Sequence, residues 1–180
     1  MTMSEVEHVL LSDLIQLYSI QRHDFMNHWQ VIMGNLQLQQ PEKALTYMRE
    51  TVVVQEQEQK IAFIHEPVLE AILLGLIIGL QQEGITATLD FPETMKKDDY
   101  WRDHWREDYA EGLYGYTREC LEVSSQSQLL LNVTAEVYLF EEPSGLACQV
   151  ILADEETVLF DKMLKLTINS QRGNSPFQEI

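Results

Sequence analysis

The feature that most constrains the fold is a helical period that runs over residues 4–39 with no proline. At about 100° per residue, the apolar side chains of this segment gather on one face of a helix. The residues within roughly 60° of the centre of that face are Leu10, Leu14, Leu17, Tyr18, Gln21, Phe25, His28, Ile32 and Leu36. A helix of this length normally pairs with other helices, so the segment predicts the first helix of a bundle.

A second helix is predicted directly after the first. Pro41 suits the first turn of a helix, Glu42 is favourable near its positive end, and the pattern continues to about Ile64. A connection this short makes the two helices antiparallel and gives a helical hairpin. Because two helices cannot bury both apolar faces, we expect the hairpin to dimerise into a four-helix bundle. Packing of the hairpin on its own C-terminal half is the alternative.

One histidine stands on the opposite side of the first predicted helix. His23 lies about 180° from the centre of the apolar face. Its neighbours on that side are uncharged, namely Gln16, Ser19, Asn27, Gln30 and Gly34. Between Leu14 and Pro41 the only Asp, Glu, Lys or Arg residues are Arg22 and Asp24, and both flank His23. A nearly neutral surface around one histidine predicts a docking surface with a reactive centre.

The chemistry that this histidine offers is phosphoryl transfer. Imidazole is a competent nucleophile near neutral pH because a large fraction of it is uncharged. Arg22 could help to hold a phosphoryl group, and Asp24 could orient or polarise the ring. Asn27, one turn further along, is a third supporting residue. The alternative is that Arg22 and Asp24 are ordinary helix charges.

The other histidines are interpreted differently. His28 lies on the apolar face, so we interpret it as a hydrogen-bonded core residue. It is five residues from His23 and on another face, so the two do not form a metal pair. His65 and His104 have no partners at ligand spacing. The aromatic set near His104 has the spacing of a helix core and indicates packing, not a nucleotide platform; it consists of Trp101, Trp105, Tyr109 and Leu113.

The pattern changes at His65-Glu66-Pro67, where we place a boundary between a helical domain over 1–65 and a second domain over 66–180. The second domain is predicted to have helices over Val68–Gln82 and Tyr100–Glu122, and strands over Ile85–Phe91, Gln128–Phe140, Leu146–Ala153 and Thr157–Asn169. The predicted loops are Pro92–Asp99, Ser124–Ser127, Glu141–Gly145 and Asp154–Glu156, with a loose tail from Ser170. The predicted fold class is therefore α+β, a hairpin followed by an α/β sandwich.

Charge excludes some partners. The net charge of −17 disfavours direct binding to nucleic acid or an anionic membrane. Residues 1–65 carry 4 basic and 8 acidic groups against 8 and 21 in residues 66–180, so the hairpin repels an acidic partner least.

The ten apolar residues Ala71–Leu80 are too few to span a bilayer, and Gly75 and Gly79 there would allow close packing. With only Cys120 and Cys148 and no signal-peptide pattern, we expect a reduced cytoplasmic protein.

The sequence around His23 resembles a known family. The run Arg22-His-Asp-Phe-Met-Asn27, followed by Gly34-Asn-Leu-Gln-Leu38, is similar to the sporulation initiation phosphotransferase B family of spore-forming Firmicutes. The resemblance is specific over residues 19–50. Beyond residue 65 it extends only to the order of the elements and their rough length.

The resemblance implies a function. In that family the hairpin dimerises, and its histidine takes a phosphoryl group from an aspartyl phosphate of one response regulator and passes it to an aspartate of a second. The resemblance assigns this role to His23 alone. It also implies receiver domains as partners, no cofactor bound by this chain, and Mg²⁺ supplied by the receiver. The C-terminal domain would resemble a histidine-kinase ATPase domain that has lost its nucleotide site.

Two alternatives remain open. A sensor kinase of the citrate/fumarate type carries a similar Arg-His-Asp-Phe-x-Asn-His run, but it needs an Asn-rich helix and glycine-rich lids to hold Mg-ATP. The corresponding helix here, residues 109–119, contains no Asn, and no Gly-x-Gly motif occurs in the chain. The other alternative is a non-enzymatic dimer that sequesters a response regulator.

Overall fold

The computed structural model describes residues 5–126, 132–143, 145–167 and 177–179. The chain divides into two compact units, Met1–Gln59 and Lys60–Ile180, and each is described by itself. The boundary that the sequence predicts after residue 65 lies a few residues beyond this division.

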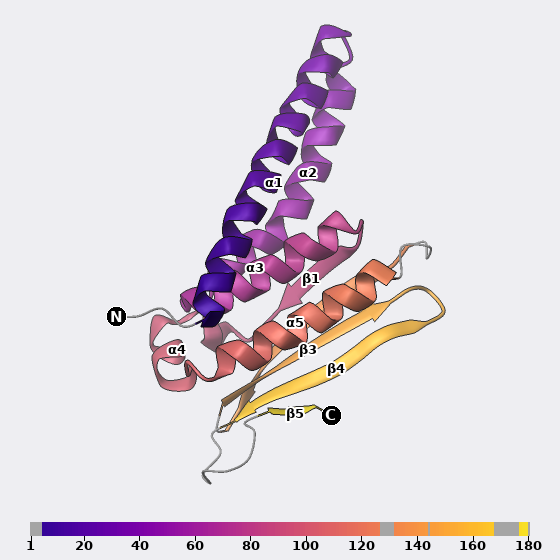
Figure 1. The fold of residues 1–180 in the computed structure, drawn as a ribbon. Coiled ribbons are helices and arrows are strands. Elements are labelled where there is room, and N and C mark those ends of the chain that lie inside the picture. Colours follow the sequence, from indigo (N-terminus) through magenta and orange to yellow (C-terminus); the bar gives the residue numbers. More distant parts are fainter. Residues whose placement is uncertain (1–4, 127–131, 144, 168–176, 180) are drawn as a thin grey trace. The chain divides into compact units, whose positions relative to one another are not determined.

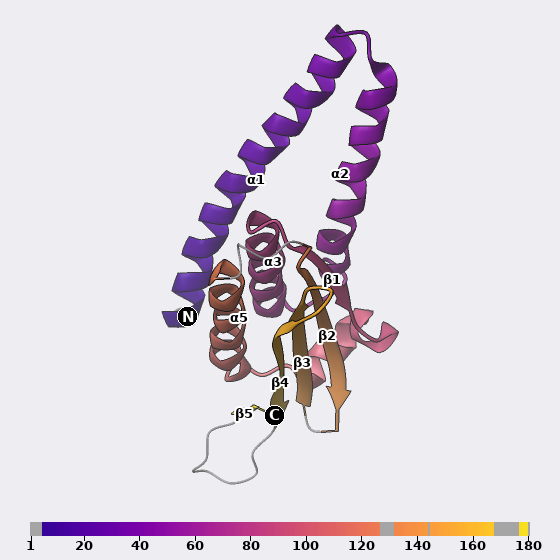
Figure 2. The ribbon, with the colours of Figure 1, turned by 90° about the vertical axis from the view of Figure 1, so that its right-hand side faces the viewer.

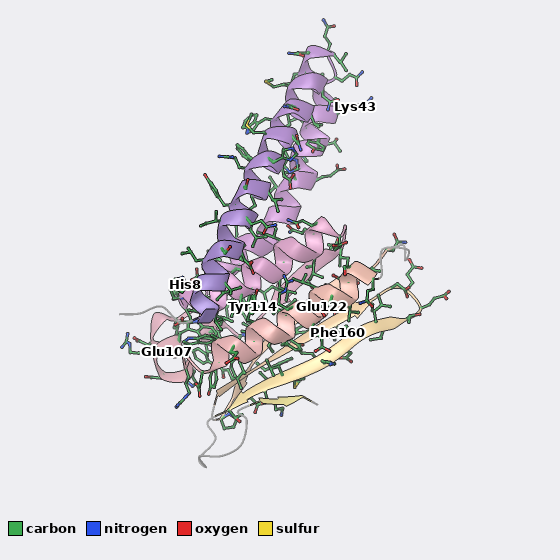
Figure 3. All side chains as sticks on the ribbon, in the orientation of Figure 1. His8, Lys43, Glu107, Tyr114, Glu122 and Phe160 are labelled. Atoms are coloured by element: carbon green, nitrogen blue, oxygen red, sulfur yellow. The ribbon has the colours of Figure 1, made fainter. Side chains whose placement is uncertain are left out.

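The first unit is the predicted helical hairpin (Figure 1). α1 (Glu5–Gln37) is a single 33-residue helix, and α2 (Pro41–Ile61) returns antiparallel to it after a short turn. Gln39 in the turn has a left-handed backbone with φ of 57°, the conformation that commonly ends a helix. Lys43 stands near the tip of the hairpin (Figure 3). Ala44 next to it is 2% exposed.

The second unit is a two-layer α/β structure. Helices α3 (Pro67–Gln82) and α5 (Tyr109–Gln126) lie side by side on one face of the sheet (Figure 2). At Gly79 they are so close that an added Cβ would lie 2.8 Å from a methyl group of Leu121, as the predicted close packing requires. The side chains with which α3 fills the core are Leu69, Ile72, Leu73, Leu76, Ile77, Ile78 and Leu80.

The sheet has five strands in sequence order, one more than predicted. They are β1 (Thr86–Asp90), β2 (Thr134–Glu142), β3 (Gly145–Ala153), β4 (Val158–Thr167) and β5 (Phe177–Glu179). β1 and β2 are parallel, and the other neighbours are antiparallel. A parallel pair needs a crossover connection, and α4 (Asp98–His104) and α5 provide it.

Two residues fix how β3 and β4 pair. A Cβ on Gly145 would lie 1.8 Å from the carbonyl oxygen of Leu166, so only glycine fits at the start of β3. Tyr116 of α5 reaches the ladder further along. Its hydroxyl accepts a hydrogen bond from the backbone N–H of Val150 at 2.8 Å and donates one to the carbonyl oxygen of Lys162 at 2.6 Å. These last two residues are register partners, so a side chain from the helical layer bridges the two strands.

One predicted helix is in fact two helices. The sequence predicted a continuous helix over Tyr100–Glu122, but the chain leaves α4 at Trp105, whose φ of −83° and ψ of 145° are extended. The two helices are anchored separately, since Trp101 is buried and its indole N–H donates to the carbonyl oxygen of Met95 at 2.6 Å, and Tyr109 is buried at the start of α5. No glycine or proline marks the break. The predicted aromatic core set is therefore divided between α4, α5 and the connection between them, where Trp105 is only half-buried.

Three further boundaries differ from the prediction. The expected loop over Pro92–Asp99 contains a short 3-10 helix, η1 (Glu93–Lys96). α5 continues through the loop expected at Ser124 because the serine hydroxyl donates to the carbonyl oxygen of Leu121 at 2.9 Å, which is compatible with a helical backbone. β2 continues through Glu142 into the expected turn.

The remaining differences concern the end of the chain. The strand expected over Gln128–Phe140 begins at Thr134 among the described residues, and 127–131 lie outside them. The tail expected to be loose from Ser170 contains β5, which pairs with β4. Residues 168–176 and 180 lie outside the described part of the chain.

Candidate functional site

His23 stands in the middle of α1 and faces solvent. Its side chain has 74% of its surface accessible. Because α1 is continuous on both sides of His23, the backbone under the imidazole is held by helical hydrogen bonds. A reactive group on such a rigid element keeps a defined position, which group transfer requires.

One ring nitrogen of His23 has two close neighbours on the same helix. Nδ1 lies 3.3 Å from Oδ1 of Asp24 and 3.2 Å from Nδ2 of Asn27. These contacts require different tautomers, since a carboxylate needs Nδ1–H as a donor and an amide N–H needs Nδ1 as an acceptor. When Nδ1 donates to Asp24, the ring proton is on Nδ1. The other ring nitrogen, Nε2, then has a free lone pair.

Nε2 is the atom available for chemistry. Within the described part of the chain, no hydrogen bond involves this nitrogen. With Nδ1–H directed at the carboxylate of Asp24, Nε2 is the nucleophilic atom, and the nearby negative charge stabilises the positive charge that the ring gains when Nε2 is substituted. The pair of His23 and Asp24 is half or more exposed, so solvent screens this interaction.

The other predicted contact residues share the surface of His23. Gln16, Ser19, Asn27 and Gln30 are exposed, and Gly34 is half-buried. A Cβ added to Gly34 would meet no atom within 4 Å, so the glycine leaves open space above the helix. We call this surface the His23 face; it consists of Gln16, Ser19, His23, Asn27, Gln30 and Gly34.

Arg22 is exposed on α1 and forms no ion pair with another described side chain. Its guanidinium is therefore available to an anion from outside this chain. The sequence predicted that Arg22 supports phosphoryl transfer, and this role stays a prediction.

His28 lies on the other side of α1 from the His23 face. Its Nδ1 is 2.8 Å from the hydroxyl of Tyr47 on α2, and the two ring centroids are 5.7 Å apart. The residue is half-buried between the two helices, in agreement with its interpretation as a hydrogen-bonded core residue. It is therefore not presented to a partner as His23 is.

The hairpin has a wider apolar surface than the sequence analysis found. Several large apolar side chains of α1 and α2 remain 43–66% exposed. They are Leu11, Ile15, Tyr18, Phe25, Met26, Trp29, Met33 and Leu36 on α1, with Leu45, Met48 and Val52 on α2. Three of them, which we call the apolar flank, lie about 60–80° from His23 on the side of Arg22; they are Ile15, Met26 and Met33. The helical projection that identified the first apolar face of α1 also places these three residues together, so the apolar flank could have been identified from the sequence.

Helix α5 of the second unit contains no Asn. It directs Tyr109, Leu113 and Tyr116 into the core. His104 stacks on Tyr100 with centroids 4.1 Å apart, and its Nδ1 lies 2.8 Å from the carbonyl oxygen of Tyr100, so this ring is engaged within α4.

Among the described residues, no three His, Cys, Asp or Glu side chains are grouped as metal ligands. Within that same part of the chain, no helix is long and apolar enough to cross a membrane.

Comparison with known proteins identifies the hairpin. Residues 1–64 match the family described as sensor kinase SpoOB-type, alpha-helical domain. No curated protein matches the chain. A domain of this type indicates histidine phosphotransfer in general, with response regulators as the general class of partner. Residues 1–64 of this chain are thus an alpha-helical domain of the SpoOB-type sensor kinase family.

Proposed function

We propose that this protein is a phosphorelay phosphotransferase. It takes a phosphoryl group from an aspartyl phosphate of one response regulator onto His23 and gives it to an aspartate of a second regulator. The observation that carries the proposal is the state of the His23 ring, with Nδ1 beside Asp24 and Nε2 open at the centre of the His23 face. The resemblance of residues 19–50 supports initiation of sporulation as the setting of this relay.

The reaction needs little from this chain. The lone pair of Nε2 attacks phosphorus, an N–P bond forms, and the P–O bond to the donor aspartate breaks as its carboxylate leaves with the electron pair. The second receiver reverses these steps. Phosphoryl transfer depends mainly on alignment and charge neutralisation, and Mg²⁺ with a lysine would come from the receiver. His23 and Asp24 then have to supply only an oriented imidazole.

The surface around His23 suits such a partner. The residues of the His23 face include no Asp, Glu, Lys or Arg, and two opposite charges, Arg22 and Asp24, flank it. A receiver with an acidic active site can therefore approach without strong repulsion, and the space above Gly34 admits its loops. Arg22, without an ion pair among the described residues, is available to the phosphoryl group.

We further propose that the protein acts as a homodimer. Several large apolar side chains of α1 and α2 are uncovered, such as Phe25 at 52% and Trp29 at 49% exposure, and exposing so many is unfavourable in water. A second copy of the hairpin would cover this surface in a four-helix bundle and give two His23 sites. Phe25→Asp should split or unfold the dimer, because burying an unpaired carboxylate is costly. A monomeric mass for the wild type in light scattering at micromolar concentration would contradict it.

The description of the matching family favours a second candidate, an ATP-dependent sensor kinase. Against it stands α5, whose residues include no Asn to hold magnesium. We propose that the second unit is a kinase-type ATPase domain that has lost its nucleotide site. Calorimetry should detect no micromolar binding of Mg-ATP; such binding would favour the kinase.

A direct test uses a receiver domain labelled on its aspartate. Incubation without ATP should move label onto the wild-type protein and not onto His23→Gln. His8 is an exposed histidine on the same helix, so His8→Gln is the matched control and should accept label like the wild type. Label on His23→Gln would refute the assignment, and no label on any form would favour the sequestering dimer.

A further inference from the structure

The apolar flank places two thioethers beside the proposed phosphoryl acceptor. Met26 follows His23 by three residues, which makes the two side chains neighbours on the helix surface. Met33 lies two turns further along the same side, next to Gln30 of the His23 face. Both methionines are 53% exposed. α2 packs on the side of His28, away from this flank.

The flank stays accessible in the proposed dimer. A four-helix bundle covers the side of α1 opposite His23, and the flank lies only about 60–80° from His23. A receiver that reaches His23 would therefore cover Met26, with Ile15 and Met33 at the border of the contact. Methionine is common on binding surfaces because its flexible, polarisable side chain adapts to a partner.

Exposed thioethers are also the methionines that oxidants reach. Hydrogen peroxide transfers one oxygen atom to sulfur as its O–O bond breaks; the sulfur loses two electrons and the second oxygen leaves as water. The product, a sulfoxide, is polar where the thioether was apolar, and reductases can restore it. Met95 provides an internal contrast, because it is 0% exposed and its carbonyl oxygen accepts a hydrogen bond from the buried Trp101.

We propose that Met26 and Met33 form an oxidation-sensitive site that controls docking of the response regulator on the His23 face. The proposal rests on the proposed phosphotransfer function. Conversion of Met26 to its sulfoxide replaces an apolar contact next to the imidazole with a strong dipole and weakens the complex. Met33 adds to the effect at the border of the contact. A peroxide-type oxidant thus slows the relay without any change at His23 itself.

The test treats the full-length dimer with hydrogen peroxide, removes it with catalase, and measures label transfer from a phosphorylated receiver. Each protein is compared with its own untreated sample. Treatment should lower the wild-type rate by about fivefold or more, and a methionine sulfoxide reductase should restore it. After treatment, the double variant Met26→Leu/Met33→Leu should transfer label at the same rate as its own untreated sample. Met48→Leu is the matched control on α2, and it should stay as sensitive as the wild type.

Peptide mass mapping supplies the second readout. Met26 and Met33 should gain oxygen well before Met95 does. The proposal is overturned if the treated wild type transfers normally, if the double variant loses its rate to the same extent, or if Met95 oxidises as fast as Met26. Absence of transfer in the untreated wild type would instead overturn the proposed function, and the oxidation proposal with it.

Discussion

Nδ2 of Asn27 lies 3.2 Å from Nδ1 of His23, one helical turn away on α1. The amide is uncharged, unlike the carboxylate of Asp24, whose Oδ1 lies 3.3 Å from the same ring nitrogen. A half-turn of the amide exchanges its nitrogen and oxygen, and with Oδ1 toward Nδ1–H it would orient the tautomer that leaves Nε2 free, without adding charge to the His23 face.

Loss of this contact should slow phosphotransfer modestly. Asn27→Ala should lower the transfer rate by about threefold to tenfold, because the amide, turned so that its Oδ1 accepts from Nδ1–H, would hold the ring in the tautomer with a free lone pair on Nε2, and a neutral hydrogen bond contributes roughly 0.5–1.5 kcal/mol. Asn35→Ala is the control, since Asn35 is also on α1 but donates to the carbonyl oxygen of Val31. Rapid-quench kinetics measures both. A loss in Asn27→Ala as complete as in His23→Gln would mean that the amide does more than orient the ring.

Gly34 should matter for docking and not for folding. Gly34→Ala should leave the hairpin intact or stabilise it by about 0.5–1 kcal/mol, since alanine is the better helix former. Its Cβ would meet no atom of this chain within 4 Å but would occupy the space proposed for the receiver. The transfer rate should therefore fall. Gly115→Ala on α5 has the same open surroundings and should leave transfer unchanged. Equal rates for both variants would exclude a close approach at Gly34.

Tyr116 should stabilise the second unit through its hydroxyl. Tyr116→Phe leaves the N–H of Val150 and the carbonyl of Lys162 without this partner, and each buried unpaired group costs about 1–3 kcal/mol. Urea unfolding should show this loss. Tyr138→Phe is the control, because its hydroxyl donates only to the exposed carboxylate of Glu136 at 2.9 Å, and its midpoint should move little. Similar midpoints for both variants would show that the bridge between β3 and β4 is not important for stability.

The two buried thiols should make folding sensitive to alkali. Burial raises the pKa of Cys120 and of Cys148 from 9.0 to about 12. Above pH 9 the unfolded chain therefore loses thiol protons that the folded chain keeps, so the free energy of unfolding should fall as pH rises from 9 towards 12. Urea unfolding of the wild type and of Cys148→Ala between pH 8 and about 10.5 measures the slope. An equal slope in both proteins would contradict this account.

The hairpin could be predicted because its signals are local. Apolar spacing over α1, and Pro41 at the start of α2, depend only on nearby residues. Buried α3 and the alternating strand β1 were predicted for the same reason. The break between α4 and α5 was missed because the apolar spacing continues across it without glycine or proline, and the separate burial of Trp101 and Tyr109 is a property of the folded unit.

The sequence named the candidate site residues, whose roles stay predictions, but it could not give their geometry. The neutral surroundings of His23 follow from the helical projection. The competition of Asp24 and Asn27 for Nδ1 depends on side-chain rotamers, which spacing does not determine. The apolar flank was missed because a projection centred on one face assigns Met26 and Met33 to neither the core nor the His23 face.

The measurement that tests the central claim most directly is relay between two receivers. A receiver labelled on its aspartate is mixed with an unlabelled second receiver and this protein, without ATP. The wild type and His8→Gln should carry label to the second receiver, and His23→Gln should carry none while it remains folded, because the side chain of His23 is outside the core. If His23→Gln still carries label from one receiver to the other, His23 is not the phosphoryl carrier and the account is wrong.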